Sequence, residues 1–126
     1  MKEVLVIALV LILVISLDII TNNYTTYAAD SLSGQFSELR EFLLKEDEEN
    51  INKKIKEIDS NWDKYKKNLS YYIEHDELEK VGSSLSALKA HIEVKEYNDA
   101  LENLDSNIFI LQHIQEKEKF SISSLF

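Results

Sequence analysis

The hydrophobic and polar positions divide the chain into a continuous apolar stretch and a longer region of regularly spaced apolar residues. Residues 4–20 contain only two polar side chains, Ser16 and Asp18. A helix rises about 1.5 Å per residue, so this stretch covers about 26 Å of the roughly 30 Å hydrocarbon core of a membrane. Residues 21–26 can supply the missing turn. The pattern predicts a transmembrane helix near the N-terminus.

Beyond residue 24, apolar residues recur every three or four positions in four successive segments, which is the spacing of one buried face of a helix. The four faces consist of Ala28, Leu32, Phe36, Leu39 and Leu43; of Ile51, Ile55, Ile58, Trp62, Tyr65, Leu69 and Tyr72; of Leu78, Val81, Leu85, Leu88 and Ile92; and of Tyr97, Ala100, Leu101, Leu104, Ile108, Leu111 and Ile114. We predict an all-α protein in which an N-terminal transmembrane helix is followed by an antiparallel bundle of three to four helices. A coiled-coil dimer through residues 51–72 is the alternative reading of the same spacing.

The first bundle segment is expected to continue the anchor helix. Gly34 and the weak helix formers of residues 21–26 predict a bend at one of these two places. Residues 45–49 are expected to form the first turn of the bundle, and Asp47 or Asn50 to cap the next helix.

Two local signals predict the positions of the last two helices. Asp76, followed three residues later by Glu79, has the form of a capping box, which predicts that the third helix starts there. A turn of two or three residues near Val94 and Lys95 predicts that the third and fourth helices form an antiparallel hairpin. The fourth helix is expected to begin at residue 96 or 97.

The charges beside the apolar stretch predict its orientation. Lys2 and the amino terminus precede the stretch, whereas the next basic residue is Arg40, and basic residues favour the cytoplasmic side. We expect a single-pass protein of the cell membrane, with residues 1–23 as cytoplasmic stub and anchor and residues 24–126 as an extracytoplasmic helical bundle. A cleaved secretory signal is the alternative, with small residues at 26–29 as the cleavage neighbourhood. The length of the apolar run favours an uncleaved anchor.

The composition excludes several classes of function. The chain has 14 basic and 23 acidic residues, and its formal net charge of −9 argues against nucleic-acid binding. It has no cysteine, which excludes disulfides, thiolate metal sites and cysteine nucleophiles. The absence of proline and the presence of only two glycines agree with a helical fold.

Two histidines are the strongest candidates for chemistry. In the predicted hairpin, residues whose numbers sum to about 190 face each other, which brings His113 level with Glu77 and near His75 and Asp76. Such a group can hold zinc through nitrogen and oxygen ligands. However, Asp76 is explained as a helix cap and His113 as a cation near a helix C-terminus, so we assign no metal ligand. No catalytic motif is present, and we expect no enzyme activity, cofactor or catalytic residue.

Other polar and aromatic features are expected to be structural. Asp18 marks the outer end of the hydrocarbon region, or else contacts a partner within the membrane. Trp62, Tyr65 and Tyr72 are predicted in the core, whereas Tyr71 falls outside the apolar face. The apolar tail is expected to fold back on the bundle or to contact a partner. Its apolar residues are Phe120, Ile122, Leu125 and Phe126.

Short runs of residues across the chain resemble one bacterial family. They are Trp62 with residues 66–69, residues 73–78, Ser84-Leu85, Leu88-Lys89, residues 99–101, His113-Ile114 and Leu125-Phe126. The family that they resemble is a domain of unknown function that carries the number four-three-six-three. The resemblance implies a membrane-anchored, mostly helical, extracytoplasmic protein of Gram-positive type, and it implies no activity.

Together these features predict a membrane-tethered, non-enzymatic interaction or structural module on the extracytoplasmic face of a bacterial membrane. Its expected partners are the lipid bilayer, through residues 4–20, and an unidentified membrane or envelope protein. One alternative is a bundle that senses a small ligand or a metal and acts through a membrane partner. Another is a helical protein secreted after signal cleavage.

Overall fold

The structure, a computed structural model, is built from four helices over the residues that it describes, 1–123, with side chains described for residues 1–120. The helices are α1 (Lys2–Leu44), α2 (Glu48–Leu69), α3 (His75–Glu93) and α4 (Tyr97–Ser123). No strand occurs between residues 1 and 123. The prediction of an all-α bundle is therefore confirmed.

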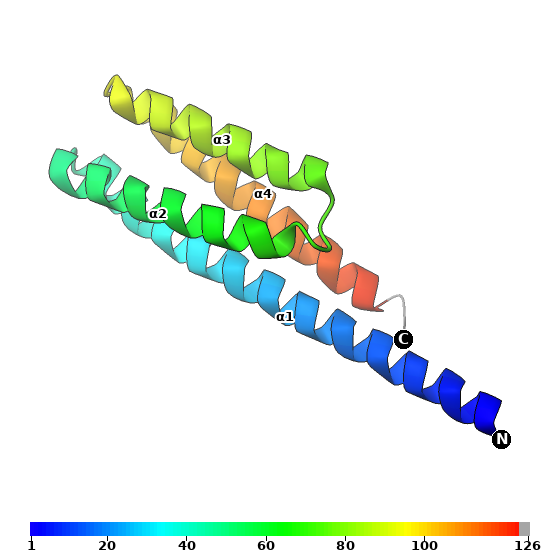
Figure 1. Ribbon diagram of the computed structural model, residues 1–126. Helices are drawn as coiled ribbons and strands as arrows, with labels where there is room; N and C mark the ends of the chain where they lie inside the picture. The colour runs from blue at the N-terminus through cyan, green and yellow to red at the C-terminus, as the bar shows by residue number, and fades with distance from the viewer. Residues whose placement is uncertain (124–126) are drawn as a thin grey trace.

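The four helices run alternately up and down as two hairpins placed side by side (Figure 1). The α1–α2 and α3–α4 turns lie at the same end of the bundle, which we call the distal end. They are joined there by an ion pair between Lys95 Nζ and Glu48 Oε2 at 3.4 Å. The α2–α3 connection lies at the opposite end, the base, where the first half of α1 leaves the bundle. Helix α1 packs against both α2 and α4, whereas α2 and α3 make few contacts with each other.

The predicted apolar faces form the core. Every predicted face residue of α1, α2 and α3 is buried, and Phe36, Leu39, Ile51, Ile58 and Leu88 are at most 1% exposed. Tyr72, which follows α2, is half-buried. On α4, Ala100, Leu104, Leu111 and Ile114 are buried, and Tyr97, Leu101 and Ile108 pack partly against them. The pattern did not predict Thr25, Ala29 and Asn107, which are buried as well.

Helix α1 does not show the predicted bend. It runs unbroken for 43 residues, through both Gly34 and residues 21–26 (Figure 1). Gly34 faces open space, since an added Cβ would meet nothing within 4 Å. The stretch 21–26 is held straight by side chains of the bundle, because the Tyr72 hydroxyl lies 2.8 Å from Thr25 Oγ1 and donates to the Thr21 carbonyl at 3.1 Å. Tertiary contacts here outweigh the weak local helix propensity.

Both distal turns have the same backbone form. In each, the amide of the last turn residue donates back across the helix end, from Asp47 to the Phe42 carbonyl and from Glu96 to the His91 carbonyl. This is the Schellman arrangement, which needs a left-handed residue just past the helix. Glu46 and Lys95 take that conformation, with φ of 53° and 60°. The predicted turns at residues 45–49 and near Val94 and Lys95 are thereby confirmed.

Asp47 is the N-cap of α2, as predicted, and its carboxylate accepts a hydrogen bond from the Asn50 amide at 3.3 Å. We expect Asp47→Ala to lower the free energy of unfolding by about 1 kcal/mol, because that amide loses its acceptor. Urea denaturation of the full chain in a maltoside detergent, followed through the single tryptophan, Trp62, measures this. Asp63→Ala, on the exposed face of the same helix, is the control and should change the stability by less than about 0.5 kcal/mol.

The predicted capping box at Asp76 is wrong. Helix α3 starts one residue earlier, at His75, with Glu74 as its N-cap and without a side-chain cap hydrogen bond. Ile73 is only 8% exposed, so the chain enters the core just before the helix and the Glu74 carbonyl accepts the first helical hydrogen bonds. Asp76 lies in the first turn, where a negative charge suits the helix dipole.

Candidate functional site

The base of the bundle contains a cavity of about 180 Å³, which we call the basal pocket. It lies where the α2–α3 connection, the first turn of α3 and the last turns of α4 meet. Its lining residues are Tyr72, Ile73, Glu74, Glu77, Ile114, Lys117 and Glu118. Three apolar or aromatic side chains thus share the pocket with three carboxyl groups and one ammonium group.

Glu77 is the most buried carboxylate among the described residues, with 8% of the residue exposed. Its Oε1 lies 3.6 Å from Lys80 Nζ and 3.7 Å from Lys117 Nζ, and Glu74 Oε2 lies 3.8 Å from Lys117 Nζ. These separations exceed hydrogen-bond length, so the lysines compensate the charge without taking up the acceptors. The other oxygen, Oε2, has no hydrogen-bond partner among the described residues.

Glu118 connects the pocket to the outer end of the apolar stretch. Burial raises the pKa of the Glu118 carboxyl above its ordinary value, the negative charge of Asp18 raises it further, and Lys117 opposes both. The last turns of α4 therefore lie beside α1 near Asp18. Asp18 itself is half-buried in this position.

The histidine group that the sequence suggested, and to which no metal ligand was assigned, is not formed in the described part of the chain. His75 is exposed and pairs with Glu79 on its own helix, with Nε2 and Oε1 2.9 Å apart. His113 is exposed on α4 and lies outside any candidate metal-ligand group found there. The side chain that comes close to Glu77 is that of Lys117 and not that of His113. A side chain on a helix reaches back toward the helix N-terminus by about one turn, which brings Lys117 to the level of Glu77.

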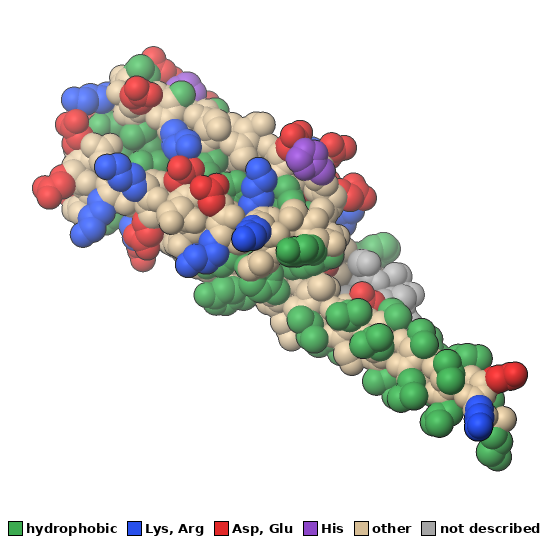
Figure 2. Space-filling model, in the orientation of Figure 1, with side chains coloured by type: hydrophobic (Ala, Val, Ile, Leu, Met, Phe, Trp, Pro, Cys, Tyr) green, Lys and Arg blue, Asp and Glu red, His purple; other side chains and the backbone are tan. Residues whose placement is uncertain are grey.

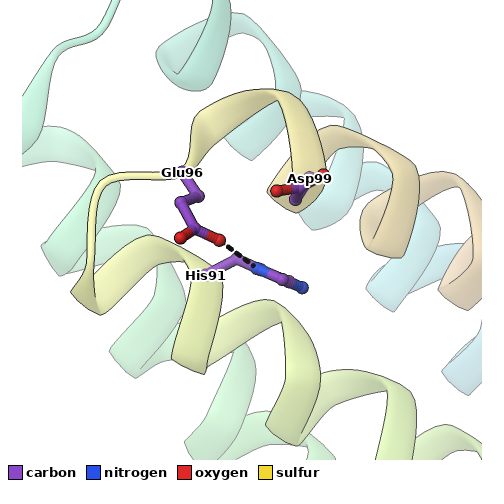
Figure 3. Close-up of side chains that lie close together, drawn as sticks. All are labelled: His91, Glu96 and Asp99. Atoms are coloured by element: carbon purple, nitrogen blue, oxygen red, sulfur yellow. Dashed lines mark hydrogen bonds and ion pairs between the residues drawn. The ribbon is translucent and has the colours of Figure 1, made fainter.

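A different group gathers at the distal end, where His91, Glu96 and Asp99 offer ligand atoms within 4.8 Å of one another (Figure 3). His91 Nδ1 and Glu96 Oε2 lie 3.1 Å apart across the α3–α4 turn. Tetrahedral zinc, with bonds of about 2.0–2.1 Å, needs four ligand atoms about 3.4 Å apart, and this group supplies three protein ligands. Glu96 and Asp99 are exposed, and the His91–Glu96 pair is accounted for by closing the turn. The predicted hairpin contained the signal for this group, because residues on either side of its turn must meet.

A shallow groove lies between α2 and α3, which pack less closely than the other pairs of neighbouring helices. It encloses about 420 Å³ and is lined mostly by polar and charged side chains, with Trp62 and Gly82 among them. Trp62 is 4% exposed and Tyr65 7%, whereas Tyr71 is 82% exposed, as the sequence predicted for each. The Tyr65 hydroxyl donates to Ser31 Oγ at 2.9 Å, which explains a tyrosine in the core.

The apolar stretch 4–20 projects from the bundle as a bare helix. Its most apolar window has a mean hydropathy of 3.1, and none of it is buried by other parts of the structure. Figure 2 shows apolar side chains around this end of α1 and charged side chains over the bundle. Such a helix is long and apolar enough to cross a membrane.

The apolar tail is described only in part. Phe120 is 75% exposed and does not fold back on the bundle, so of the two predicted alternatives only contact with a partner applies to this residue. Leu125 and Phe126, and the side chain of Ile122, lie outside the described part of the structure.

Comparison with known proteins places most of the chain in one family. The model described as "Domain of unknown function (DUF4363)" matches residues 19–125. The match begins at the outer end of the apolar stretch and covers the whole bundle. No curated protein and no solved structure matches the chain.

Proposed function

The chain belongs to the DUF4363 family, a family of unknown function, and from its structure we propose that it is a membrane-tethered, non-enzymatic interaction or structural module on the extracytoplasmic face of a bacterial membrane. Lys2–Leu44 form one helix that has two parts with opposite surroundings. Residues 4–20 expose their apolar side chains, whereas seven residues from Thr25 to Leu43 are buried in the bundle. This observation carries the proposal.

The continuity of α1 gives the tether a specific mechanical property. Because the helix is unbroken and its Thr21 and Thr25 are hydrogen-bonded to Tyr72, the bundle cannot swing freely about the anchor. A module held in this way presents fixed surfaces at a fixed height above the bilayer. The polar groove between α2 and α3 is one such surface, and it supports a role in contacting another protein.

Labelling of single cysteines in intact cells tests the proposed topology, because the natural chain has none. We expect Ser60→Cys, on the exposed face of α2, to react with a membrane-impermeant maleimide. We expect Glu3→Cys, which keeps Lys2, to react only after the cells are opened, because it would lie on the cytoplasmic side. Both variants should stay in the membrane fraction after alkaline extraction.

Three results would contradict the proposal. Labelling of Glu3→Cys but not of Ser60→Cys in intact cells would show the opposite orientation. Release of the protein on alkaline extraction, with loss of the N-terminal residues by mass spectrometry, would favour the secreted bundle. Hydrolysis or group transfer by the purified chain would end the non-enzymatic assignment.

A further inference from the structure

The basal pocket combines charge and burial in a way that the fold does not require. Its lining holds the carboxyl groups of Glu74, Glu77 and Glu118 against a single ammonium group, that of Lys117. Lys117 Nζ is 3.8 Å from Glu74 and 3.7 Å from Glu77, which is too long for hydrogen bonds. The carboxylates therefore keep acceptor capacity that the protein itself does not use.

Glu77 is the decisive residue. A carboxylate on a side chain that is only 11% exposed normally has hydrogen-bond donors on both oxygens, since burying a charge without them costs several kcal/mol. Here Oε1 has two distant lysines, and Oε2 has no partner among the described residues. A positively charged ligand in the pocket would lie closer to the charge of Glu77 than the two lysines do and would compensate it more strongly.

The rest of the lining indicates an organic cation and not a metal ion. Tyr72, Ile73 and Ile114 form an apolar wall, and the face of a tyrosine ring attracts a cation through its quadrupole. Among the described residues, the pocket carboxylates do not form a group close enough to chelate a metal, a spacing found only at His91, Glu96 and Asp99.

The size of the pocket limits the ligand. A volume of 180 Å³ equals about six water molecules at about 30 Å³ each. This admits a ligand of about four to six heavy atoms, such as ethanolamine or propylamine, both of which are ammonium ions at neutral pH. We propose that the basal pocket binds a small primary alkylammonium group, held by Glu77 together with Glu74 and Glu118 and packed against Tyr72 and the two isoleucines.

The position of the pocket indicates two sources for this group. It lies at the end of the bundle from which the apolar half of α1 projects. The negative charge of Asp18, on α1, contributes to raising the pKa of the Glu118 carboxyl in the pocket lining. The ammonium group could thus belong to a lipid headgroup of the ethanolamine type or to a free amine in solution. Only the lipid source rests on the membrane placement proposed above.

Methyl NMR of the full chain provides the test, with the isoleucine methyl groups labelled and the protein in maltoside micelles. Ethanolamine or propylammonium is added to about 50 mM at constant ionic strength, since a ligand of only about four heavy atoms is expected to bind with a millimolar dissociation constant. We expect saturable shifts of the Ile73 and Ile114 methyls and none at Ile51, which is buried at the distal end. Sodium chloride at the same concentration should shift neither the Ile73 nor the Ile114 methyl signals.

Two variants with matched controls assign the binding to the carboxylates. Glu77→Gln keeps the shape of the side chain and removes its charge, so we expect affinity to fall about tenfold. Glu79→Gln, exposed on the same helix, should bind as the wild type does. Lys117→Gln removes the competing cation and should raise affinity several-fold, a gain that misfolding cannot produce. Lys119→Gln, exposed and outside the pocket lining, is its control.

Nanodiscs separate the two sources. Shifts at Ile73 and Ile114 in phosphatidylethanolamine relative to phosphatidylglycerol bilayers, without added amine, would establish the headgroup as ligand. Shifts only with soluble amine would establish a free amine. The absence of saturable shifts in both settings, or equal affinities of wild type, Glu77→Gln and Lys117→Gln, would overturn the proposal. The micelle experiment keeps its meaning even if the membrane topology above proves wrong.

Discussion

Phe36→Ala is expected to lower the free energy of unfolding by about 3–5 kcal/mol, because removing a large buried side chain leaves a cavity that the neighbours fill only in part. Phe36 is 1% exposed and lies on α1, the helix that packs against both α2 and α4. A loss of this size is a large fraction of the roughly 5–15 kcal/mol that stabilises a domain. It should therefore bring the bundle close to unfolding.

Urea denaturation of the full chain in maltoside, followed by Trp62 fluorescence, measures this loss. Phe109→Ala is a matched control, since Phe109 is on α4 and 69% exposed, and it should cost less than about 0.5 kcal/mol. Equal losses for the two phenylalanines would contradict the arrangement of α1 between α2 and α4. The measurement concerns the bundle alone and does not depend on membrane placement.

Asn107→Asp is expected to destabilise the bundle by about 3–5 kcal/mol at pH 7, because it places an uncompensated charge in the core. Asn107 is 0% exposed, and its side-chain amide donates to Ser84 Oγ at 2.9 Å and to the Asn103 carbonyl at 3.2 Å. A carboxylate has no hydrogen to donate, and its negative charge would face the partial negative charge of the Asn103 carbonyl oxygen. The substitution leaves the size of the side chain almost unchanged, so the effect measures charge and hydrogen bonding.

The loss should depend on pH in a defined direction. Burial raises the pKa of the introduced carboxyl group in the folded state above the unfolded value of about 3.9. The penalty is therefore complete above the folded-state pKa and shrinks as the pH falls toward about 4, where only the lost amide donors still cost stability. Unfolding of variant and wild type compared at pH 7 and pH 4 isolates this change.

Asn52→Asp is the control for this experiment, because Asn52 is exposed in α2 and its replacement should change stability by less than about 0.5 kcal/mol at either pH. A pH-independent difference between Asn107→Asp and wild type would mean that the new carboxyl group reaches water. That result would contradict the tight packing of α4 in the core.

The fold could be predicted from the sequence to the extent that it depends on spacing. Leu32, Leu39 and Leu43 recur at helical intervals, and each is at most 2% exposed. Asp47 was identifiable as a cap because its carboxylate acts on an amide three residues away. Asp76 misled the prediction, because the burial of Ile73, a contact across the bundle, moved the helix start to His75.

The candidate sites were less predictable, because they depend on residues that meet across helices. The facing register placed His113 level with Glu77, but helix geometry points the Lys117 side chain there and leaves His113 exposed. The burial of Asn107 was not predicted, since no sequence pattern reveals that Ser84 lies opposite it. The burial of Thr25 could not be predicted for the same reason, because it depends on the contact with the hydroxyl of Tyr72.

The sequence by itself determined the apolar stretch at residues 4–20, the four helices and the side chains that form most of the core, because these follow from short-range periodicity along one chain. Only the tertiary structure decided that α1 continues straight through Gly34, and that Glu77, Tyr72 and Lys117 enclose a pocket at the base. The reason is physical. Hydrophobic burial is indifferent to which apolar neighbour a helix meets, whereas hydrogen bonds, ion pairs and cavities depend on the position of each atom in three dimensions.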